Sequence, residues 1–304
     1  MRILISGASG FLGSALAAHL EGAGHEVTRL VRRPSASAHE IAWDPARGAL
    51  DAAAVEGFDG VVNLSGERIA GRWSKARKQR LWNSRVESTR LLSETLARLE
   101  RRPNVLVSMS ATGFYGDRGD EELTESSREG KGFLSRLARA WEQAADPARR
   151  AGVRIVHPRA GIVLAAHGGA LARLLPPFRL GVGGPIGAGR AWWSWIALPD
   201  ALAAFEFALR HETLSGPVNF VVPGPVRNAE FARALGRALS RPALLPVPAA
   251  ALRLAFGELA DEALLSSARV VPAKLLAAGH AFRFPRLDEA LRDALGRPAT
   301  AAAV

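Results

Sequence analysis

Three glycines near the start of the chain have the spacing of a phosphate-binding turn. The chain opens Met-Arg-Ile-Leu-Ile-Ser-Gly-Ala-Ser-Gly-Phe-Leu-Gly, so a short apolar run gives way to Gly7, Gly10 and Gly13. Gly7 would let the chain turn sharply, Gly10 would let backbone approach a pyrophosphate, and Gly13 would let the next helix pack close to the strand. A helix N-terminus, here predicted over about Phe11 to Glu21, favours negative charge. The pattern predicts a dinucleotide site; the alternative is a glycine-rich turn without a ligand.

Two arginines follow the second predicted strand, at the point where a dinucleotide fold meets the adenosine ribose. The strand is predicted over Glu26 to Val31, and Arg32-Arg33-Pro34 come next. An acidic residue there would bind the ribose 2′-hydroxyl of NAD, whereas guanidinium groups suit a 2′-phosphate. The sequence therefore predicts NADP as the cofactor. The alternative is that both arginines are merely solvated.

The composition is that of a globular protein with a sizeable core. The chain has 304 residues, 48% of them hydrophobic, and a mean hydropathy of +0.04; this length allows one large domain or a large and a small one. It has no cysteine, which excludes disulfides and a thiolate nucleophile. The seven histidines show no ligand spacing, so no metal site is expected.

A formal net charge of +11 raises the question of nucleic-acid binding. Only four of the 40 basic residues are lysine, and the arginines are scattered over the whole length, so we expect no nucleic-acid partner. The N-terminus lacks the pattern of a signal peptide, and no apolar run reaches the ~18 residues of a membrane span. A cytoplasmic protein without a membrane partner is expected.

Strand and helix patterns alternate through the first half, which predicts a parallel sheet with helices on both faces. After the first two strands, strands are predicted near 41–43 and over 60–64, 105–108 and 153–156, and helices over 74–99 and 132–145. The expected fold class is α/β, a doubly wound parallel Rossmann sheet with a smaller C-terminal substrate or cap region. Ligands of such sheets lie at the carboxyl ends of the strands. The turns expected to meet there follow Ile5, Val31, Leu64, Ser108 and Val156.

Three regions are predicted along the chain. The first is an NADP-binding Rossmann domain over 1–163, whose sheet also includes a return strand near 218–222. The second is a Gly/Pro/Trp-rich substrate-side segment over 164–217, and the third is a C-terminal helical module over 244–295. The middle segment contains Trp192-Trp193-Ser194-Trp195, which is more typical of a core or an interface than of ligand stacking. Residues 298–304 have the composition of a frayed tail.

Six short motifs carry a family resemblance. Gly7-Ala-Ser-Gly-Phe-Leu-Gly13, Ser110-Ala-Thr-Gly-Phe-Tyr-Gly116 and Arg159-Ala-Gly161 resemble the extended short-chain dehydrogenase/reductase superfamily, with its sugar-nucleotide epimerases and dehydratases. Asn63-Leu-Ser-Gly-Glu67, Trp193-Ser-Trp-Ile196 and Asn228-Ala-Glu-Phe231 resemble an uncharacterised branch, "epimerase family protein", also labelled cell-division-inhibitor-like, which has its own C-terminal module. The cofactor-binding residues that the turn, the two arginines and the resemblance together indicate are Gly7, Ser9, Gly10, Phe11, Leu12, Gly13, Arg32, Arg33, Leu64, Ser65, Gly66, Ser108 and Arg159.

The superfamily's proton chemistry uses a Tyr-x-x-x-Lys pair, in which lysine lowers the tyrosine pKa, beside a polarising serine or threonine. Ser110 stands where the serine of the relatives does. Aligning Glu142 with the glutamate that follows the lysine of the relatives puts Leu134 at the tyrosine position and Ala138 at the lysine position. The pair is therefore missing. A further departure is Arg85, where many relatives have an asparagine.

Some other group must then carry a proton. Glu67 directly follows the strand at 60–64 and is expected to face the nicotinamide end; the alternative is an ion pair with an arginine such as Arg68 or Arg72. Tyr115, the only tyrosine, and Asp117 are lesser candidates. The catalytic candidates are Ser110, Glu67 and Tyr115.

Two functions remain open. The first is an NADP-binding epimerase- or oxidoreductase-like protein with an atypical active site that acts on a small polar, for example sugar-like, substrate. The second is a non-catalytic NADP-binding sensor or regulator with a protein partner. A homo-oligomer is compatible with both.

Overall fold

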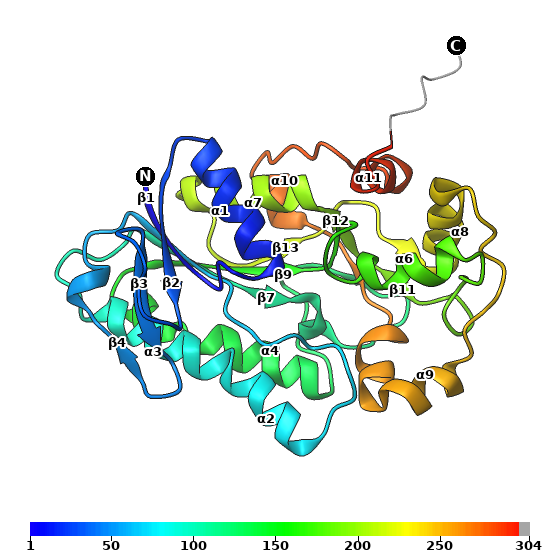
Figure 1. The fold of residues 1–304 in the computed structure, drawn as a ribbon, viewed down its shortest axis with the longest axis horizontal. Coiled ribbons are helices and arrows are strands. Elements are labelled where there is room, and N and C mark those ends of the chain that lie inside the picture. The colour runs from blue at the N-terminus through cyan, green and yellow to red at the C-terminus, as the bar shows by residue number, and fades with distance from the viewer. Residues whose placement is uncertain (298–304) are drawn as a thin grey trace, which may run out of the picture. The chain divides into compact units, whose positions relative to one another are not determined.

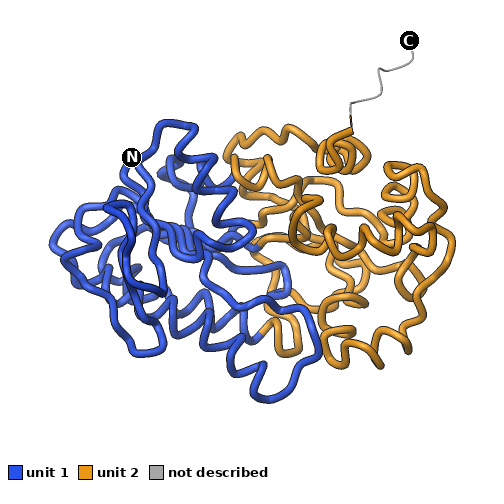
Figure 2. The backbone as a smooth tube through the Cα atoms, in the orientation of Figure 1, with its two compact units in different colours: residues 1–114, 136–159, 204–218 blue, residues 115–135, 160–203, 219–304 orange. Residues whose placement is uncertain are grey.

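The structure, a computed structural model, describes residues 1–297, so the predicted tail at 298–304 lies outside the described residues. The chain forms two compact units, shown in Figure 2. Unit 1 contains residues 1–114, 136–159 and 204–218, and unit 2 contains residues 115–135, 160–203 and those from 219 onward.

The core of unit 1 is a mostly parallel sheet with the strand order β13-β9-β6-β5-β1-β2-β3-β4. Its strands are β1 (Arg2–Ser6), β2 (Glu26–Val31), β3 (Glu40–Asp44), β4 (Ala49–Leu50), β5 (Gly60–Asn63), β6 (Val105–Ser108), β9 (Arg154–Ala160) and β13 (Gly216–Phe220), and β7 (Ser110–Ala111) pairs with β9. All pairs from β3 to β9 are parallel, and β4 forms an antiparallel hairpin with β3. Outward from β1 the chain goes to β2 on one side and to β5 on the other, which is the switch point of a doubly wound sheet. The predicted fold class is confirmed.

Helices cover both faces of this sheet. The helices that accompany the sheet strands are α1 (Phe11–Gly22), α2 (Lys75–Asn83), α3 (Val86–Ala97), α4 (Phe133–Gln143), α5 (Asp146–Arg150) and α7 (Leu198–Arg210). Two short helical turns, η1 (Ala53–Val55) and η2 (Thr112–Tyr115), occur between them. Figure 1 shows α1 and α7 on one face and α3 and α4 on the other. Consequently β5 and β6 are buried along their whole length, as expected for apolar parallel strands covered on both sides.

The single helix predicted over 74–99 is wrong, because the helix is broken between Asn83 and Val86. The Ser84 hydroxyl donates to the carbonyl of Leu81 and accepts the Glu67 N–H, and the Arg85 N–H bonds to the carbonyl of Trp82, three residues back. Such local side-chain bonds of serine compete with helix continuation. Two smaller corrections concern strand limits: β9 runs on to Ala160 rather than ending at 156, and β13 covers 216–220 rather than 218–222.

Unit 2 is built from short strand pairs and helices. Its strands are β8 (Glu122–Leu123), β10 (Ile162–Leu164), β11 (Trp192–Trp193), β12 (Trp195–Ala197), β14 (Val226–Arg227) and β15 (Arg269–Val270). Its further helices are α6 (Leu171–Arg179), α8 (Asn228–Leu239), α9 (Ala249–Phe256), a π-helical turn (Ala260–Leu264), α10 (Ala273–Ala277) and α11 (Leu287–Ala294). None of the helices described is both long and apolar enough to cross a bilayer.

The tryptophan-rich segment contributes mainly to the core of unit 2. Trp193 and Trp195 are buried, and the Trp193 ring packs 5.1 Å from the ring of Phe231 on α8. Trp192 is half-buried and is flanked by the guanidinium groups of Arg227 and Arg269, at 4.1 Å and 5.1 Å from its ring centre. The core interpretation of this segment is confirmed for two of its three tryptophans.

His157 on β9 links the sheet to α5 inside unit 1. Its Nδ1 lies 3.3 Å from the carbonyl oxygen of Ser108, and its Nε2 lies 3.2 Å from the Arg149 guanidinium. Because arginine has no acceptor, Nε2 must accept and Nδ1–H must donate, which is the neutral imidazole. Burial lowers the pKa of His157 to about 4.

This histidine should make the stability of the protein sensitive to acid. Its pKa in an unfolded chain is about 6.5, so below pH 6.5 the unfolded chain takes up a proton that the folded chain binds only near pH 4. We expect this stabilisation to be complete above pH 6.5 and to fall by about 2 kcal/mol at pH 5. Urea unfolding of the wild type and of His157→Asn at pH 7.5 and 5.0 tests this. The free energy of unfolding should fall less between these pH values in the variant than in the wild type. An equal fall in both proteins would contradict the prediction.

Candidate functional site

The carboxyl ends of the parallel strands bring polar residues to one edge of the unit 1 sheet. The strand register places Ser6 of β1 opposite Asn63 of β5, and Asn63 opposite Ser108 of β6. The glycine turn follows β1, the two arginines follow β2, and Leu64-Ser65-Gly66 follow β5. All of these predicted residues therefore gather at the same edge, as expected for a doubly wound sheet.

The glycine turn has the geometry that a pyrophosphate needs. Gly7 has a φ of +70°, and a Cβ on it would lie 2.6 Å from the carbonyl oxygen of Leu64. A Cβ on Gly13 would lie 2.2 Å from the carbonyl oxygen of Gly7, so this glycine permits the close packing of α1. A Cβ on Gly10 would meet only that same carbonyl, at 3.2 Å, and otherwise open space. No side chain caps the N-terminus of α1, and its first turn has no acidic residue. The turn therefore fits a phosphate ligand.

The two arginines after β2 differ in their surroundings. The Arg33 guanidinium donates to both carboxylate oxygens of Glu40, at 2.9 Å and 2.6 Å, and this hydrogen bonding lowers the pKa of Glu40. Arg32 is exposed and makes no hydrogen bond or ion pair with residues 1–297. Arg32 is thus the group with its donors available for a 2′-phosphate, whereas Arg33 holds the loop.

A buried amide connects the strand ends beneath the edge. Asn63 Oδ1 accepts from the Ser6 hydroxyl at 2.6 Å, and Asn63 Nδ2 donates to Thr89 at 2.7 Å and to Ser108 at 3.2 Å. The Ser65 hydroxyl donates to Ser6 at 2.9 Å, and its N–H reaches Asn63 Oδ1 at 3.3 Å. In the sequence, Asn63 stands out only as part of the motif at 63–67. The signal that could have revealed its role is an asparagine at the end of an otherwise apolar strand.

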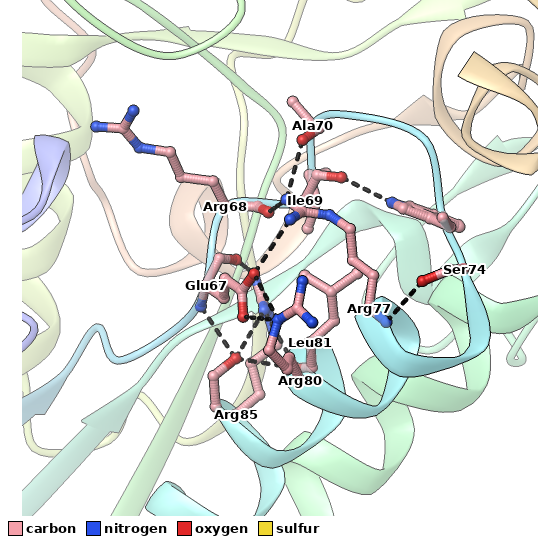
Figure 3. Close-up of polar contacts among 11 residues, drawn as sticks. Glu67, Arg68, Ile69, Ala70, Ser74, Arg77, Arg80, Leu81 and Arg85 are labelled. Atoms are coloured by element: carbon pink, nitrogen blue, oxygen red, sulfur yellow. Dashed lines mark hydrogen bonds and ion pairs between the residues drawn. The ribbon is translucent and has the colours of Figure 1, made fainter.

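Glu67 is paired with nearby arginines, as the alternative interpretation predicted, and two of these partners are Arg77 and Arg80. Its carboxylate lies 3.2 Å from Arg77 Nη1 and 3.4 Å from Arg80 Nε (Figure 3). Its side chain remains 31% exposed, so the carboxylate can still meet a small molecule.

Further hydrogen bonds hold the loop that carries Glu67. Arg77 Nη2 donates to the carbonyl oxygens of Arg68 and Ala70, at 2.7 Å and 3.0 Å, and the Trp73 indole donates to that of Ile69 at 2.7 Å. Figure 3 shows the Arg68 guanidinium pointing away from this cluster. The loop is therefore held by bonds to its backbone, which sequence reasoning did not anticipate because no local pattern marks them.

Arg85 also hydrogen-bonds to the backbone of this loop. It donates from Nη2 to the carbonyl of Glu67 at 2.9 Å and from Nη1 to that of Leu81 at 3.3 Å, and it lies 5.2 Å from the Trp141 ring centre. A Cβ on Gly66 would lie 3.2 Å from this guanidinium. Burial lowers the pKa of Arg85 to about 10, so the group stays charged at neutral pH.

Ser110 is engaged by a buried ion pair. Its hydroxyl donates to Glu142 Oε1 at 2.7 Å, and Arg159 donates to both oxygens of the same carboxylate at 2.8 Å and 2.9 Å. The side chains of Arg159 and Glu142 are 3% and 12% exposed, and the guanidinium stacks 3.5 Å from the ring centre of Phe114. In this arrangement the Ser110 proton points at Glu142 and not at a ligand.

Neither position of the missing pair carries an ionisable group. Leu134 and Ala138 lie one turn apart on α4, with Ala138 buried. The Leu134 N–H and the Phe133 N–H both donate to the carboxylate of Glu262, at 2.9 Å and 2.7 Å. A residue of the C-terminal module thus binds the first turn of α4, which is stabilising for a helix N-terminus.

Tyr115 belongs to unit 2 and is fully buried. Its hydroxyl donates to Asn219 Oδ1 at 2.7 Å, and Asn219 Nδ2 donates to the carbonyl of Val271 at 2.9 Å. Asp117 also has structural contacts there, since it accepts the Gly119 N–H at 3.1 Å. Within residues 1–297, no group of three or more His, Asp or Glu side chains could hold a metal ion.

Comparisons with known proteins agree with this fold. The sequence profile of the NAD dependent epimerase/dehydratase family matches residues 3–222, and a domain of unknown function (DUF1731) matches residues 247–294. Epimerase family protein Mb2239 of Mycobacterium bovis is 45% identical over 297 residues, which are 97% of this chain and 98% of that protein.

Crystal structures of related proteins, among them the following two, are similar over 97% of this chain. The human epimerase family protein SDR39U1 (isoform 2) with NADPH has a TM-score of 0.89 and 36% identity, with 99% of that chain covered. The nucleoside-diphosphate sugar epimerase of Corynebacterium glutamicum has a TM-score of 0.79 and 34% identity, with 58% of that chain covered.

The Glu142–Arg159 pair should be strongly coupled, because removing one partner leaves the other charge buried. We expect Arg159→Met to lower the free energy of unfolding by about 3 to 5 kcal/mol, and Glu142→Gln with Arg159→Met together to cost less than the two single changes summed. Urea unfolding of the four proteins of this cycle is the measurement. The exposed pair Glu87–Arg90 is the matched control, since Arg90→Met should cost under about 1 kcal/mol. Additive effects at positions 142 and 159 would disprove the coupling.

Proposed function

Since the chain belongs to the NAD dependent epimerase/dehydratase family, we propose that it binds NADP(H) and uses it on a small polar, for example sugar-like, substrate without a Tyr-x-x-x-Lys pair. The observation that carries the proposal is the glycine turn at the uncapped start of α1, next to an arginine without a partner among the residues described. The NADPH in the crystal structure of human SDR39U1, a relative similar along its whole length, supports the choice of nucleotide.

Each end of the nucleotide has its own residues. Gly7, Gly10 and Gly13 would admit the pyrophosphate, with Ser9, Phe11 and Leu12 beside it, and Arg32 would take the 2′-phosphate. Leu64, Ser65 and Gly66 would lie along the nucleotide, and Ser108 and Arg159 toward its far end. When bound, the nicotinamide supplies or accepts a hydride. The protein must then hold the reacting alcohol or ketone and move its proton.

Glu67 is the best placed of the three proton-carrying candidates. The Ser110 hydroxyl donates a hydrogen bond to Glu142, and Tyr115 is fully buried, whereas the carboxylate of Glu67 is partly exposed. The ion pairs with Arg77 and Arg80 would fix the position of this carboxylate. Glu67 would therefore act as the base, with those arginines as positioning residues.

The same contacts favour the second function, a non-catalytic NADP-binding sensor with a protein partner. All three candidate groups already serve structural bonds, and Leu134 and Ala138 cannot ionise. A protein that keeps the cofactor site while its reacting groups are used for packing needs the nucleotide only as a signal. Cofactor binding without turnover would favour this function.

Cofactor preference should depend on Arg32. A charge-assisted hydrogen bond is worth ~1.5 to 3 kcal/mol, so Arg32→Ala should weaken NADPH binding tenfold or more and leave NADH binding unchanged. Arg33→Ala, the matched control, should have a smaller effect because Glu40 holds that guanidinium. Calorimetric titration of both nucleotides decides the matter. Equal affinity of the wild type for NADPH and NADH would refute the assignment.

Gly10→Val provides an independent check in the same titrations. Gly10 has a φ of −79°, which valine adopts without strain, so circular dichroism should show an intact fold. The valine side chain would fill the space of the pyrophosphate, so neither nucleotide should bind. Normal binding would place the phosphate elsewhere.

Without the pair, turnover of sugar nucleotides such as UDP-glucose should be negligible, because general acid–base help is worth ~100-fold to 10,000-fold. Any NADPH-dependent activity found in a carbonyl screen should fall ~100-fold or more in Glu67→Gln and change little in Tyr115→Phe. Absorbance at the reduced nicotinamide band measures both. Loss of activity in Tyr115→Phe with full activity in Glu67→Gln would make Tyr115 the proton carrier instead.

A further inference from the structure

The C-terminal end of α8 carries a basic pocket that the proposed function does not use. Its volume is about 420 Å³, and it is lined by Arg233, Gly236, Arg237, Ser240, Arg241, Ala243 and Leu244. All of these residues belong to unit 2, and none of them is acidic. The volume is in the range of small-molecule sites.

The three guanidinium groups are set by the helix and its turn. Arg233 and Arg237 are four residues apart on α8 and therefore share a face. Arg237 donates to Asp288 on α11 at 2.9 Å, and Arg241 Nε donates to the carbonyl of Arg179 at 3.0 Å. Arg233 makes no hydrogen bond or ion pair with the other described residues and is exposed. The pocket thus presents positive charge, and among its three arginines only Arg237 is paired with a carboxylate, that of Asp288 outside the lining.

Ser240 adds a strained donor to the same pocket. Its φ of 55° makes it the only non-glycine residue with a positive φ among those described. The position is the left-handed end of α8, where the Arg241 N–H bonds to the carbonyl of Gly236 at 2.9 Å, and glycine is the usual choice there. Serine differs from glycine by its hydroxymethyl group, and Ser240 is one of the residues that line the pocket. Strain kept at a cavity indicates a function for that group.

Large exposed apolar side chains lie on the loop that follows α8 and on the neighbouring loop that follows α6. Leu180 and Leu244 are each 78% exposed, Val182 is 52% exposed and Leu245 is 55% exposed. The two loops that carry them lie side by side, because a Cβ on Gly184 would be 2.1 Å from the carbonyl oxygen of Leu245. Such a concentration of exposed aliphatic groups marks a binding surface.

We infer that this pocket binds a small amphiphilic anion, a molecule with a phosphate or carboxylate head group and an aliphatic chain. The arginines and Ser240 would hold the head group by charge-assisted hydrogen bonds. The chain would cover the exposed leucines and valine. Three arginines around one pocket suit the head group of a single molecule, and a second copy of this basic surface would be repelled.

Calorimetry with three probes tests this on the full chain: dodecyl phosphate below its micelle concentration, inorganic phosphate, and dodecyl maltoside. Dodecyl phosphate should bind, inorganic phosphate at least ~100-fold more weakly, and the neutral maltoside not measurably. Arg233→Gln should weaken binding ~tenfold, and Leu180→Ser with Leu244→Ser by ~tenfold or more. Ser240→Gly should lower affinity ~fivefold while the melting temperature stays the same or rises, which separates recognition from folding.

Matched variants outside the pocket are Arg98→Gln, which removes an exposed arginine of unit 1, and Leu276→Ser, which removes a half-exposed leucine of unit 2. Both should bind dodecyl phosphate like the wild type. The inference fails if these controls weaken binding equally, if inorganic phosphate binds as tightly as dodecyl phosphate, or if no probe binds. It also fails if only vesicles with phosphatidylserine bind, or if sedimentation shows a dimer that Leu244→Ser dissolves, since a membrane or a second copy would then be the occupant.

Discussion

The amide of Asn63 is the interaction on which the edge of the unit 1 sheet depends. Its two donors and two acceptor lone pairs are all engaged, by Ser6, Ser65, Thr89 and Ser108. These partners lie on β1, on the loop after β5, on α3 and on β6, so one buried side chain sets the spacing of the strand ends. A buried network of this kind is stabilising only when every member is satisfied. That condition explains why hydroxyl residues occur at strand ends that are otherwise apolar.

Arginine side chains hold several local structures of this chain through hydrogen bonds and ion pairs. Arg77 and Arg85 bind backbone carbonyls of the loop after β5, and Arg159 stands against Glu142 inside unit 1. A planar guanidinium presents five donors in a rigid fork and can bond several carbonyls in fixed directions, whereas the lysine ammonium is a compact group with three donors. Part of the positive charge thus belongs to arginines that bind groups within the fold. This agrees with the absence of a contiguous basic stripe in the sequence.

The fold could be predicted from the sequence because its signals are local. The glycine turn, the apolar strands and the alternation with helices each occupy a few consecutive residues, and Gly7 and Gly13 fulfil the backbone roles that their spacing indicated. The break at Ser84 could not be predicted, because it depends on a bond from Glu67, seventeen residues away. The same holds for Tyr115, whose partner Asn219 lies 104 residues further along the chain. Pairings between distant segments leave no pattern in a single sequence.

The two ends of the site differ in how far their polar groups are already bound to partners within the protein. At the glycine turn, no side chain caps the start of α1, and Arg32 makes no hydrogen bond or ion pair with residues 1–297. At the other end, Ser110 and Glu67 are bound to charged partners that would have to be disturbed before either could exchange a proton. Rearranging Glu67 costs less, because its partners are partly solvated, whereas freeing Ser110 means opening a pair that is almost fully buried. If the protein is a catalyst, the loop after β5 is therefore where its chemistry must differ from that of relatives with the tyrosine and lysine.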